Sequence, residues 1–246
     1  GAAAGVRGAA ASPLYRPLGG GVVIRAVLFD FDGVIGDTMS WHLRAWKEVL
    51  ATVGITLVPE MVLKNEGRPA GEIAKIIADA VGVPMTREQA EEIARRKNER
   101  FRELHRATAA RGSVELVEEL KSRRVKVALV TGTERANVHA VLPAELVAMF
   151  DAIVAAGDAH RGKPHPDPYL LAARRVGVDP VHCLVVENAP SGIRAAREAG
   201  MKCVALRTTL PDQYLQGADL IVDDLPALLA LLDGLHVGVT PGRKRA

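Results

Sequence analysis

The sequence predicts an α/β fold, in which a doubly wound parallel sheet carries an all-helical segment inserted after its first strand. Short, almost continuously apolar runs alternate with helical patterns, which is typical of parallel strands buried on both faces. The stretch from residue 39 to residue 109 departs from this alternation and has helical patterns alone. Polar residues stand directly after the first, second and fourth apolar runs and in the loop that follows the third. Together these features predict two domains and one polar edge of the sheet.

Six segments have the composition of buried strands, namely 22–30, 125–131, 151–156, 182–188, 202–206 and 218–222. Helical patterns cover 113–123, 134–142, 166–176, 190–199 and 225–233. This alternation of strands and helices predicts a Rossmann-like core built from residues 22–38 and 110–237.

The helical segment 39–109 is expected to form a smaller cap domain above the strand ends. Its helical patterns lie at 41–54, 70–82 and 86–106. Residues 1–21 are rich in Gly and Ala and lack periodicity, so we expect a flexible arm there. For the basic end, residues 238–246, we expect a loose and solvated tail.

Composition narrows the class of protein. The chain has 246 residues, of which 48% are hydrophobic and 25% are charged, as in a soluble globular protein. A net charge of +3 does not indicate nucleic-acid binding. No apolar run approaches the roughly 20 residues that span a bilayer, and no signal pattern opens the chain, so we expect a cytoplasmic protein without a membrane partner. The scarcity of Asn and Gln favours a thermophilic source, whereas the excess of Arg over Lys has genome composition as an alternative explanation.

Two cysteines exclude a disulfide scaffold. Cys183 and Cys203 open two strands that we expect to lie side by side, so a disulfide is possible if their registers match. Two buried free thiols are the preferred interpretation, because cytosolic disulfides are rare.

Polar side chains follow the strands at the edge where parallel sheets bind ligands. They are Asp30, Asp32, Thr131, Gly132, Lys163, Glu187 and Asn188. Each one alone is weak evidence, since an Asp after a strand is usually a turn or capping residue. Their coincidence at one edge predicts a single site. Carboxylates, an amide and a lysine there suit a Mg²⁺ ion and a phosphoryl group.

Four segments carry a resemblance to a known family: FDFDGVIGDT (29–38), VTG (130–132), GKPHPDP (162–168) and VENAPSGIRAAREAG (186–200). In this order they resemble the four motifs of the haloacid dehalogenase superfamily, and the match runs over 24–233. The cap, with Asp37-Thr38, His42, Trp46 and Lys97-Asn98, is similar to that of the β-phosphoglucomutase-like and phosphoglycolate-phosphatase-like subfamily.

The resemblance implies Asp30 as a nucleophile that forms an aspartyl phosphate, which splits one difficult displacement into two easier ones. It implies Asp32 as general acid and then general base, with Thr131 and Lys163 stabilising the phosphoryl group. It implies Mg²⁺ as cofactor, held by Asp30, Asp32, Glu187 and Asn188. Asn188 stands where the family usually has an acid, so we expect weaker metal binding or a different hydration of the metal.

Cap residues His42, Arg68 and Lys97, together with Gly132 and Arg135, are candidates for sensing the substrate. Each cap residue also has an ordinary alternative: His42 could only pack, Arg68 could be a loop charge, and Lys97 could lie on a solvated helix face. Asp37 either orients the nucleophile loop or caps the first cap helix.

The expected function is therefore Mg²⁺-dependent hydrolysis of a small phosphate monoester, of the sugar phosphate or phosphoglycolate type. A hexose-phosphate mutase of the β-phosphoglucomutase type is the alternative, and a silent binding module is a third possibility that the pair Asp30/Asp32 argues against. Mutases of the family grip a second phosphate with positive charge, whereas Ala70 and Glu134 stand at the corresponding places here, which favours hydrolysis. The expected partner is a small phosphorylated metabolite, and the expected state is a monomer or weak homodimer.

Overall fold

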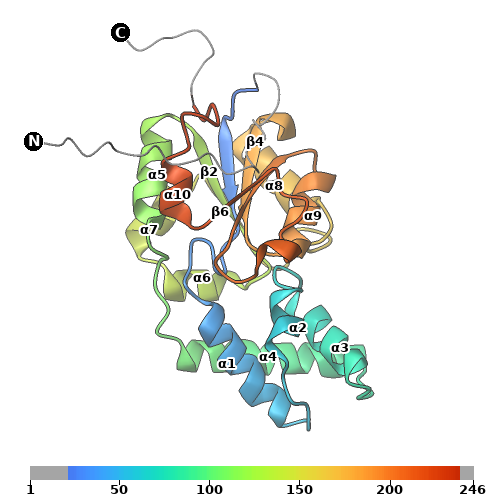
Figure 1. Cartoon of the computed structure of the whole chain (residues 1–246). Helices are drawn as coiled ribbons and strands as arrows, with labels where there is room; N and C mark the ends of the chain where they lie inside the picture. The colour runs from blue at the N-terminus through green and yellow to red at the C-terminus, as the bar shows by residue number, and fades with distance from the viewer. Residues whose placement is uncertain (1–21, 239–246) are drawn as a thin grey trace, which may run out of the picture.

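The computed structural model describes residues 22–238 (Figure 1). In this part of the chain six parallel strands form one sheet in the order β3-β2-β1-β4-β5-β6, which confirms the predicted parallel α/β architecture. The strands are β1 (Ala26–Phe29), β2 (Lys126–Val130), β3 (Ala152–Val154), β4 (Cys183–Glu187), β5 (Lys202–Leu206) and β6 (Leu220–Val222). β1 lies between β2 and β4, so the polar residues after these three strands meet at the centre of the sheet edge.

Successive residues of the strands pack into two separate hydrophobic clusters. Val27 and Phe29 of β1 belong to one cluster, whereas Ala26 and Leu28 belong to the other. The first cluster is covered by α5 (Ser113–Ser122), α6 (Arg135–Val141), α7 (Ala144–Met149) and α10 (Leu225–Leu229). The second is covered by α8 (Asp167–Val176) and α9 (Pro190–Glu198). Burial of both faces explains why the strands are apolar throughout.

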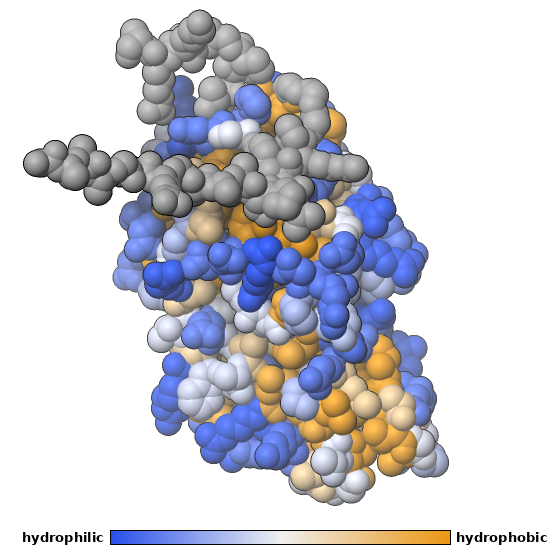
Figure 2. All heavy atoms as spheres, viewed as in Figure 1, coloured by the Kyte–Doolittle hydropathy of each residue, from blue (hydrophilic) through white to orange (hydrophobic). Residues whose placement is uncertain are grey.

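The helices inserted after β1 pack around a hydrophobic cluster of their own, which includes Trp46 and Ile77. They are α1 (Met39–Ala51), α2 (Pro59–Leu63), α3 (Ala70–Ala80) and α4 (Arg87–Leu104). A capping box of Thr86 and Gln89 begins α4. Figure 1 places these helices together beyond the carboxyl ends of the strands. Figure 2 shows hydrophobic surface on this domain. Val53, Val58 and Val81 are the large hydrophobic residues that are exposed in the described part of the cap.

Two chain crossings connect the cap helices to the sheet, and they lie side by side. The backbone N–H of Asp37 donates to Thr108, and that of Ala110 donates to Ile35. Gly36 and Ala109 form an antiparallel bridge between the crossings. The cap is therefore joined to the core through one narrow hydrogen-bonded pair of segments.

Several sequence predictions differ from the structure in detail. The first strand is β1 (Ala26–Phe29) rather than 22–30, and the last helix ends at Leu229 rather than 233. The short helices α2 and α7 were not predicted, because five or six residues show too little of a helical period. The arm 1–21 and most of the tail lie outside the described residues, and Gly238 still donates to Ile24.

Both cysteines are buried free thiols within residues 22–238, which confirms the preferred interpretation. The strands do lie side by side, but Cys203 is in register with Val185 and Cys183 is in register with Ala26 of the opposite neighbour. No helix in the described part of the chain is long and apolar enough to cross a membrane.

Candidate active site

The nucleophile candidate Asp30 directly follows the central strand β1 and is 2% exposed. Its backbone N–H donates to Val186, which continues the pairing with β4. The chain then turns tightly at Gly33, whose φ is +81°, a conformation that glycine tolerates best. A side chain at this position would also meet the Asn188 amide, because a Cβ atom would lie 2.4 Å from it. The turn therefore brings the strand ends of β1 and β4 into direct contact.

Lys163 links the two acids at these strand ends. Its ammonium group lies 2.6 Å from Asp30 Oδ1 and 2.6 Å from Glu187 Oε1, and it also donates to the Val130 carbonyl at 3.0 Å. Burial lowers the pKa of Lys163, but the charges of Asp30 and Glu187 outweigh that effect and hold it above its usual range. Burial also raises the pKa of Asp30, against the attraction of Lys163. Lys163 is therefore a fixed, buried positive charge beside the nucleophile candidate.

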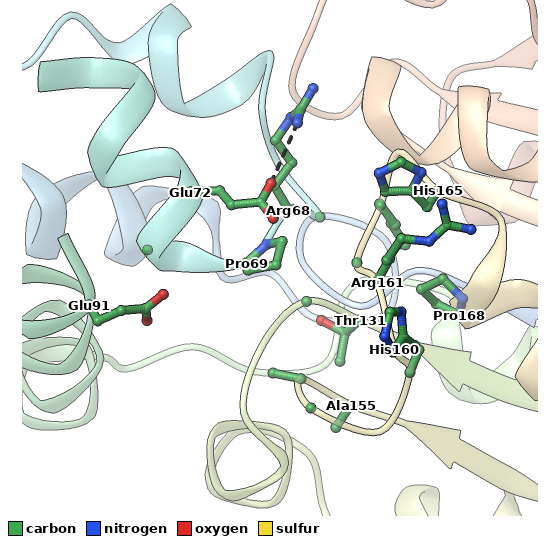
Figure 3. A pocket seen from close by; sticks show the side chains of 18 of the residues that line it. Arg68, Pro69, Glu72, Glu91, Thr131, Ala155, His160, Arg161, His165 and Pro168 are labelled. Atoms are coloured by element: carbon green, nitrogen blue, oxygen red, sulfur yellow. Dashed lines mark ion pairs between the residues drawn. The ribbon is translucent and has the colours of Figure 1, made fainter. Parts of the chain in front are cut away.

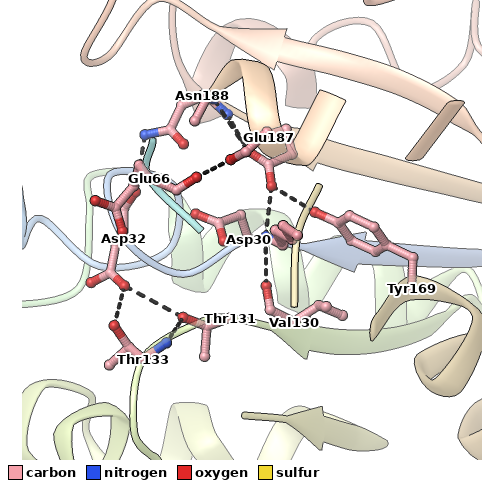
Figure 4. Close-up of polar contacts among 12 residues, drawn as sticks. Asp30, Asp32, Glu66, Val130, Thr131, Thr133, Tyr169, Glu187 and Asn188 are labelled. Carbon is pink, nitrogen blue, oxygen red and sulfur yellow. Dashed lines mark hydrogen bonds and ion pairs between the residues drawn. The ribbon is translucent and has the colours of Figure 1, made fainter. Parts of the chain in front are cut away.

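Glu187 uses both of its oxygens within the protein. Oε1 accepts from Lys163 and from the Tyr169 hydroxyl at 2.7 Å, and Oε2 accepts from the backbone N–H groups of Asn188 and Ala189 (Figure 4). Gly192 is needed beside it, since a Cβ there would overlap the Glu187 carboxylate at 1.6 Å. This acid is thus built in as the anchor of Lys163.

Asp32 accepts hydrogen bonds from both domains. Thr38 Oγ1 donates to its Oδ1 at 2.7 Å, and Thr133 Oγ1 donates to its Oδ2 at 2.7 Å. His42, on the first cap helix, lies 2.9 Å from Oδ1 through Nε2. Burial raises the pKa of Asp32, but attraction to His42 and these donors outweigh it and hold the pKa below its usual range. Asp32 therefore rests ionised in this arrangement.

The tautomer of His42 follows from its second partner. The Lys97 ammonium lies 2.8 Å from His42 Nδ1, and an ammonium group can only donate, so Nδ1 accepts and Nε2 carries the proton toward Asp32. Burial and the charge of Lys97 lower the pKa of His42, which keeps the ring neutral at pH 7. The depression of the Asp32 pKa then rests on donated hydrogen bonds more than on a charged imidazole. Of these two cap residues predicted from sequence, His42 contacts the acid–base candidate directly and Lys97 contacts His42 from behind.

The cap loop between α2 and α3 sits directly on the core. A Cβ atom on Gly132 would lie 2.6 Å from the Gly67 carbonyl oxygen, and one on Gly67 would lie 2.7 Å from the Lys163 side chain. A Cβ on Gly162 would meet the ring of Pro69 at 2.7 Å. Three glycines therefore let the cap loop pack closely against the core, and at Gly132 the contact is between backbones.

This closure carries Glu66 into the site. Its carbonyl accepts from Ser191 Oγ of α9, and Figure 4 shows its side chain beside Asp32. Burial, with repulsion from Asp32, raises the pKa of Glu66 to about 7, although Lys97 and Lys163 attract its charge. Glu66 was not predicted as a functional residue, because a charged residue in a short loop gives no signal in the sequence.

Two buried oxygen atoms without hydrogen-bond partners mark a place where a cation would fit. Within residues 22–238, Asp30 Oδ2 and Asn188 Oδ1 are buried and accept no hydrogen bond. The Asp32 carbonyl lies beside them, because Asn188 Nδ2 donates to it at 2.9 Å. No group of three or more His, Cys, Asp and Glu side chains in the described chain is arranged for a metal. A carboxylate, an amide and a carbonyl oxygen nevertheless fit the preference of Mg²⁺ for hard oxygen ligands.

A cleft of about 840 Å³ opens beside this closed centre, between the cap and the loop that carries Lys163. Figure 3 shows Arg68 of the cap facing His160, Arg161 and His165 across it. Arg68 lies 3.6 Å from Glu72, and Arg161 pairs with Asp167. Arg68 Nε is buried without a partner in the described chain.

Other candidates lie apart from the buried centre. Arg135 pairs with Asp158 at 2.8 Å and donates to the Ile153 carbonyl, on the surface of the core. Asp37 is exposed, and Thr38 rather than Asp37 precedes the first residue of α1.

Tyr169 belongs to the buried centre but was not predicted as a site residue, because its position on α8 matches the apolar period of that helix.

Comparison with known proteins agrees with this geometry. The model of the haloacid dehalogenase-like hydrolases matches residues 27–206. A fructose-1-phosphate phosphatase of Escherichia coli (strain K12) is 37% identical over 183 residues, which are 74% of this chain and 95% of that protein. The chloroplastic protein SUPPRESSOR OF QUENCHING 1 of Arabidopsis thaliana is 34% identical over 214 residues, and the match spans only 20% of its length.

Among solved structures, a putative β-phosphoglucomutase from Bacteroides vulgatus has a TM-score of 0.78 and 30% identity, and the match covers 89% of this chain and 91% of that one. The chain belongs to the haloacid dehalogenase-like hydrolase family. It is a phosphatase of the β-phosphoglucomutase-like kind.

Proposed function

We propose that the protein is a Mg²⁺-dependent phosphatase that hydrolyses a small sugar phosphate through an aspartyl phosphate on Asp30. The observation that carries this proposal is the pairing of two buried carboxylates with different partners. Asp30 is held by the core lysine Lys163 at 2.6 Å, and Asp32 is held by four donors, namely Thr38, Thr131, Thr133 and His42 of the cap. Such a difference in surroundings suits one nucleophile and one acid–base group.

In the first half-reaction a carboxylate oxygen of Asp30 attacks phosphorus, and the bond from phosphorus to the substrate oxygen breaks. Asp32 gives its proton to the departing alkoxide. Because four donors favour its ionised form, we expect Asp32 to take up that proton when the anionic phosphate arrives and raises its pKa. Lys163 and the backbone N–H groups that follow Asp30 and Thr131 offset the charge on the transferring group.

In the second half-reaction Asp32, now ionised, accepts a proton from water while the water oxygen attacks phosphorus. The bond from phosphorus to Asp30 breaks, which releases inorganic phosphate and restores both carboxylates. The closed loop over Gly132 keeps other water out of the site.

Asp30, the Asp32 carbonyl and Asn188 would hold Mg²⁺, by the two unpartnered oxygens and the carbonyl beside them. Bound there, the metal supplies positive charge that neutralises the transferring phosphoryl group. Glu187 instead holds Lys163 and the loop after β4, because four donors already engage it.

The leaving group would lie under Glu66 and Lys97, which come from different parts of the cap and attract each other. A carboxylate and an ammonium together suit hydroxyl groups, which both donate and accept hydrogen bonds. A second anion on the leaving group would be repelled by Glu66. This supports a sugar phosphate over phosphoglycolate, and the relative that acts on fructose 1-phosphate agrees with it.

A hexose-phosphate mutase is the second candidate. It is favoured by the similarity to the putative β-phosphoglucomutase from Bacteroides vulgatus and by Arg68 Nε, which has no hydrogen-bond partner within residues 22–238. One contact weighs against it, since Arg135 is engaged by Asp158. Glu134 also stands where a mutase of the family has a lysine, so the positive charge of that lysine is missing here. With little free positive charge for a second phosphate, water is the expected acceptor.

The test is a phosphate-release panel of sugar monophosphates, phosphoglycolate and nucleotides, with Mg²⁺ and with EDTA. We expect Mg²⁺-dependent release, fastest from the sugar phosphates. Asp30→Asn, prepared in parallel, controls for contaminating phosphatases. The mutase is tested with β-glucose 1-phosphate and a trace of the 1,6-bisphosphate. Rapid glucose 6-phosphate formation with negligible phosphate release would overturn the proposal.

A further inference from the structure

Hydrogen bonds run from Asp32 into the cap along a defined path. His42 of α1 contacts Asp32 at 2.9 Å, and Lys97 of α4 contacts His42 at 2.8 Å. Lys97 also lies 3.4 Å from the side-chain oxygen of Asn98, the next residue of α4. His42, Lys97 and Asn98 are 1%, 5% and 9% exposed, so solvent does not compete for these contacts.

The path returns to the core at Glu134. Asn98 Nδ2 donates to its Oε1 at 2.8 Å, and Arg102, one turn further along α4, donates to its Oε2 at 3.0 Å. Arg102 also donates to Asn137 Oδ1 at 3.1 Å. Glu134 directly follows Thr133, whose hydroxyl donates to the other oxygen of Asp32. The contacts therefore form a closed ring. It runs from Asp32 through His42, Lys97 and Asn98 of the cap to Glu134, and returns to Asp32 through Thr133.

Glu134 is the acceptor that holds α4 in place within this ring. Asn98 and Arg102 belong to the cap and Glu134 belongs to the core, so both bonds form only when the cap is closed. They fix the turn of α4 that carries Lys97, and Lys97 in turn determines which nitrogen of His42 holds the proton. The charge of Glu134 also acts on Lys97 directly.

We propose that Glu134 is a positioning residue for Asp32, which couples closure of the cap to the orientation of the general acid. Its carboxylate is engaged by the cap rather than turned toward a second phosphate. The inference rests on the proposed hydrolysis, in which Asp32 gives a proton to the leaving group.

A positioning role for Glu134 and a role in cap closure alone predict different results for substrates with different leaving groups. An alkoxide leaving group needs the proton of Asp32, whereas p-nitrophenolate departs without one. For two esters that react only in the closed state, weaker closure lowers kcat/KM by the same factor, because it lowers the population of that state for both. Misplacement of the general acid Asp32 lowers kcat/KM selectively for the alkyl ester. The parameter kcat/KM is used because it reports the step in which the leaving group departs.

The experiment compares a sugar phosphate found in the panel with p-nitrophenyl phosphate, for wild type and for Glu134→Ala, Glu134→Gln and Glu145→Ala. Glu145 is an exposed acid of α7 and is the matched control. For Glu134→Ala we expect kcat/KM to fall about tenfold more on the sugar phosphate than on the aryl ester, as two bonds to a partly exposed carboxylate are lost. Glu134→Gln keeps an acceptor for Asn98 and should recover part of that selective loss.

Equal losses on the two substrates would overturn the inference and leave Glu134 as a residue of closure only. No loss on either would overturn it as well. Failure of the proposed phosphatase function can be distinguished from failure of this inference, because the wild-type protein would then release no phosphate from either ester.

Discussion

Gly132→Ala is expected to disturb the closed state while leaving the core intact. The new Cβ would lie 2.6 Å from the Gly67 carbonyl oxygen and 3.0 Å from that of Arg68, whereas ordinary contacts begin near 3.4 Å. The cap loop would have to withdraw by about 0.8 Å, because both obstacles are backbone atoms that cannot rotate away. Overpacking of this kind costs roughly 1–3 kcal/mol, which corresponds to a loss of about 5- to 150-fold in kcat/KM.

The assay is kcat/KM for the best sugar phosphate together with a melting curve. Gly132 has no strained backbone angle that alanine would oppose, and its obstacles lie in the cap, so the melting temperature should change little. Gly71→Ala is the matched control, since its Cβ meets only the end of the exposed Glu91 side chain. If kcat/KM of Gly132→Ala stays within about twofold of wild type, the cap does not close on Gly132 during turnover and the reasoning fails.

Three further predictions concern the carboxylates and the metal. Asp30→Asn should abolish turnover while the protein stays folded, because an amide forms no acyl phosphate; activity above about a hundredth of wild type would exclude Asp30 as nucleophile. Asn188→Asp should lower the melting temperature in EDTA, because the hydrogen bonds that the amide donates to Asp32 and Thr209 are lost at a cost of about 1–3 kcal/mol. The same variant should show a larger rise in melting temperature when Mg²⁺ is added. An unchanged response to Mg²⁺ would exclude Asn188 from the metal site. Burial raises the pKa of Glu66 from 4.5 to about 7, so the folded state keeps a proton that the unfolded state releases, and stability in EDTA should fall as pH rises from about 4.5 to 7. Glu66→Gln should flatten that part of the pH profile, and an unchanged profile would contradict the burial of this carboxyl.

The sheet and the core of the site could be predicted from sequence because they depend on local signals. Apolar runs mark strands, and the edge where parallel strands end collects Asp30, Lys163 and Glu187 in any arrangement of this topology. The finer assignment of partners could not be predicted in this way. Glu187 was expected at the metal but is engaged by four donors, two of which are backbone N–H groups that no sequence pattern displays.

The cap was harder to predict because its contacts join residues that are far apart in the chain. Glu134 illustrates this limit. From sequence its charge was expected to repel a second phosphate, whereas in the structure both oxygens are bonded to Asn98 and Arg102, more than thirty residues earlier. The conclusion in favour of hydrolysis stands on other contacts, since Arg135 is held by Asp158.

The two carboxylates proposed as catalytic, Asp30 and Asp32, depend on the cap to different degrees. Lys163 holds Asp30, and within residues 22–238 every hydrogen-bond partner of that lysine belongs to the core, so the nucleophile candidate keeps Lys163 when the cap opens. Asp32 loses His42 on opening, and with it the link to Lys97, but keeps Thr133. In the proposed mechanism, opening would therefore leave the acid–base candidate without its cap partner and spare the partners of the nucleophile candidate. Transfer to an alkyl substrate would then wait for closure, because the open state lacks the contact from His42 that orients Asp32. On this proposal the cap controls the proton transfers of Asp32, and the core determines where phosphorus is attacked.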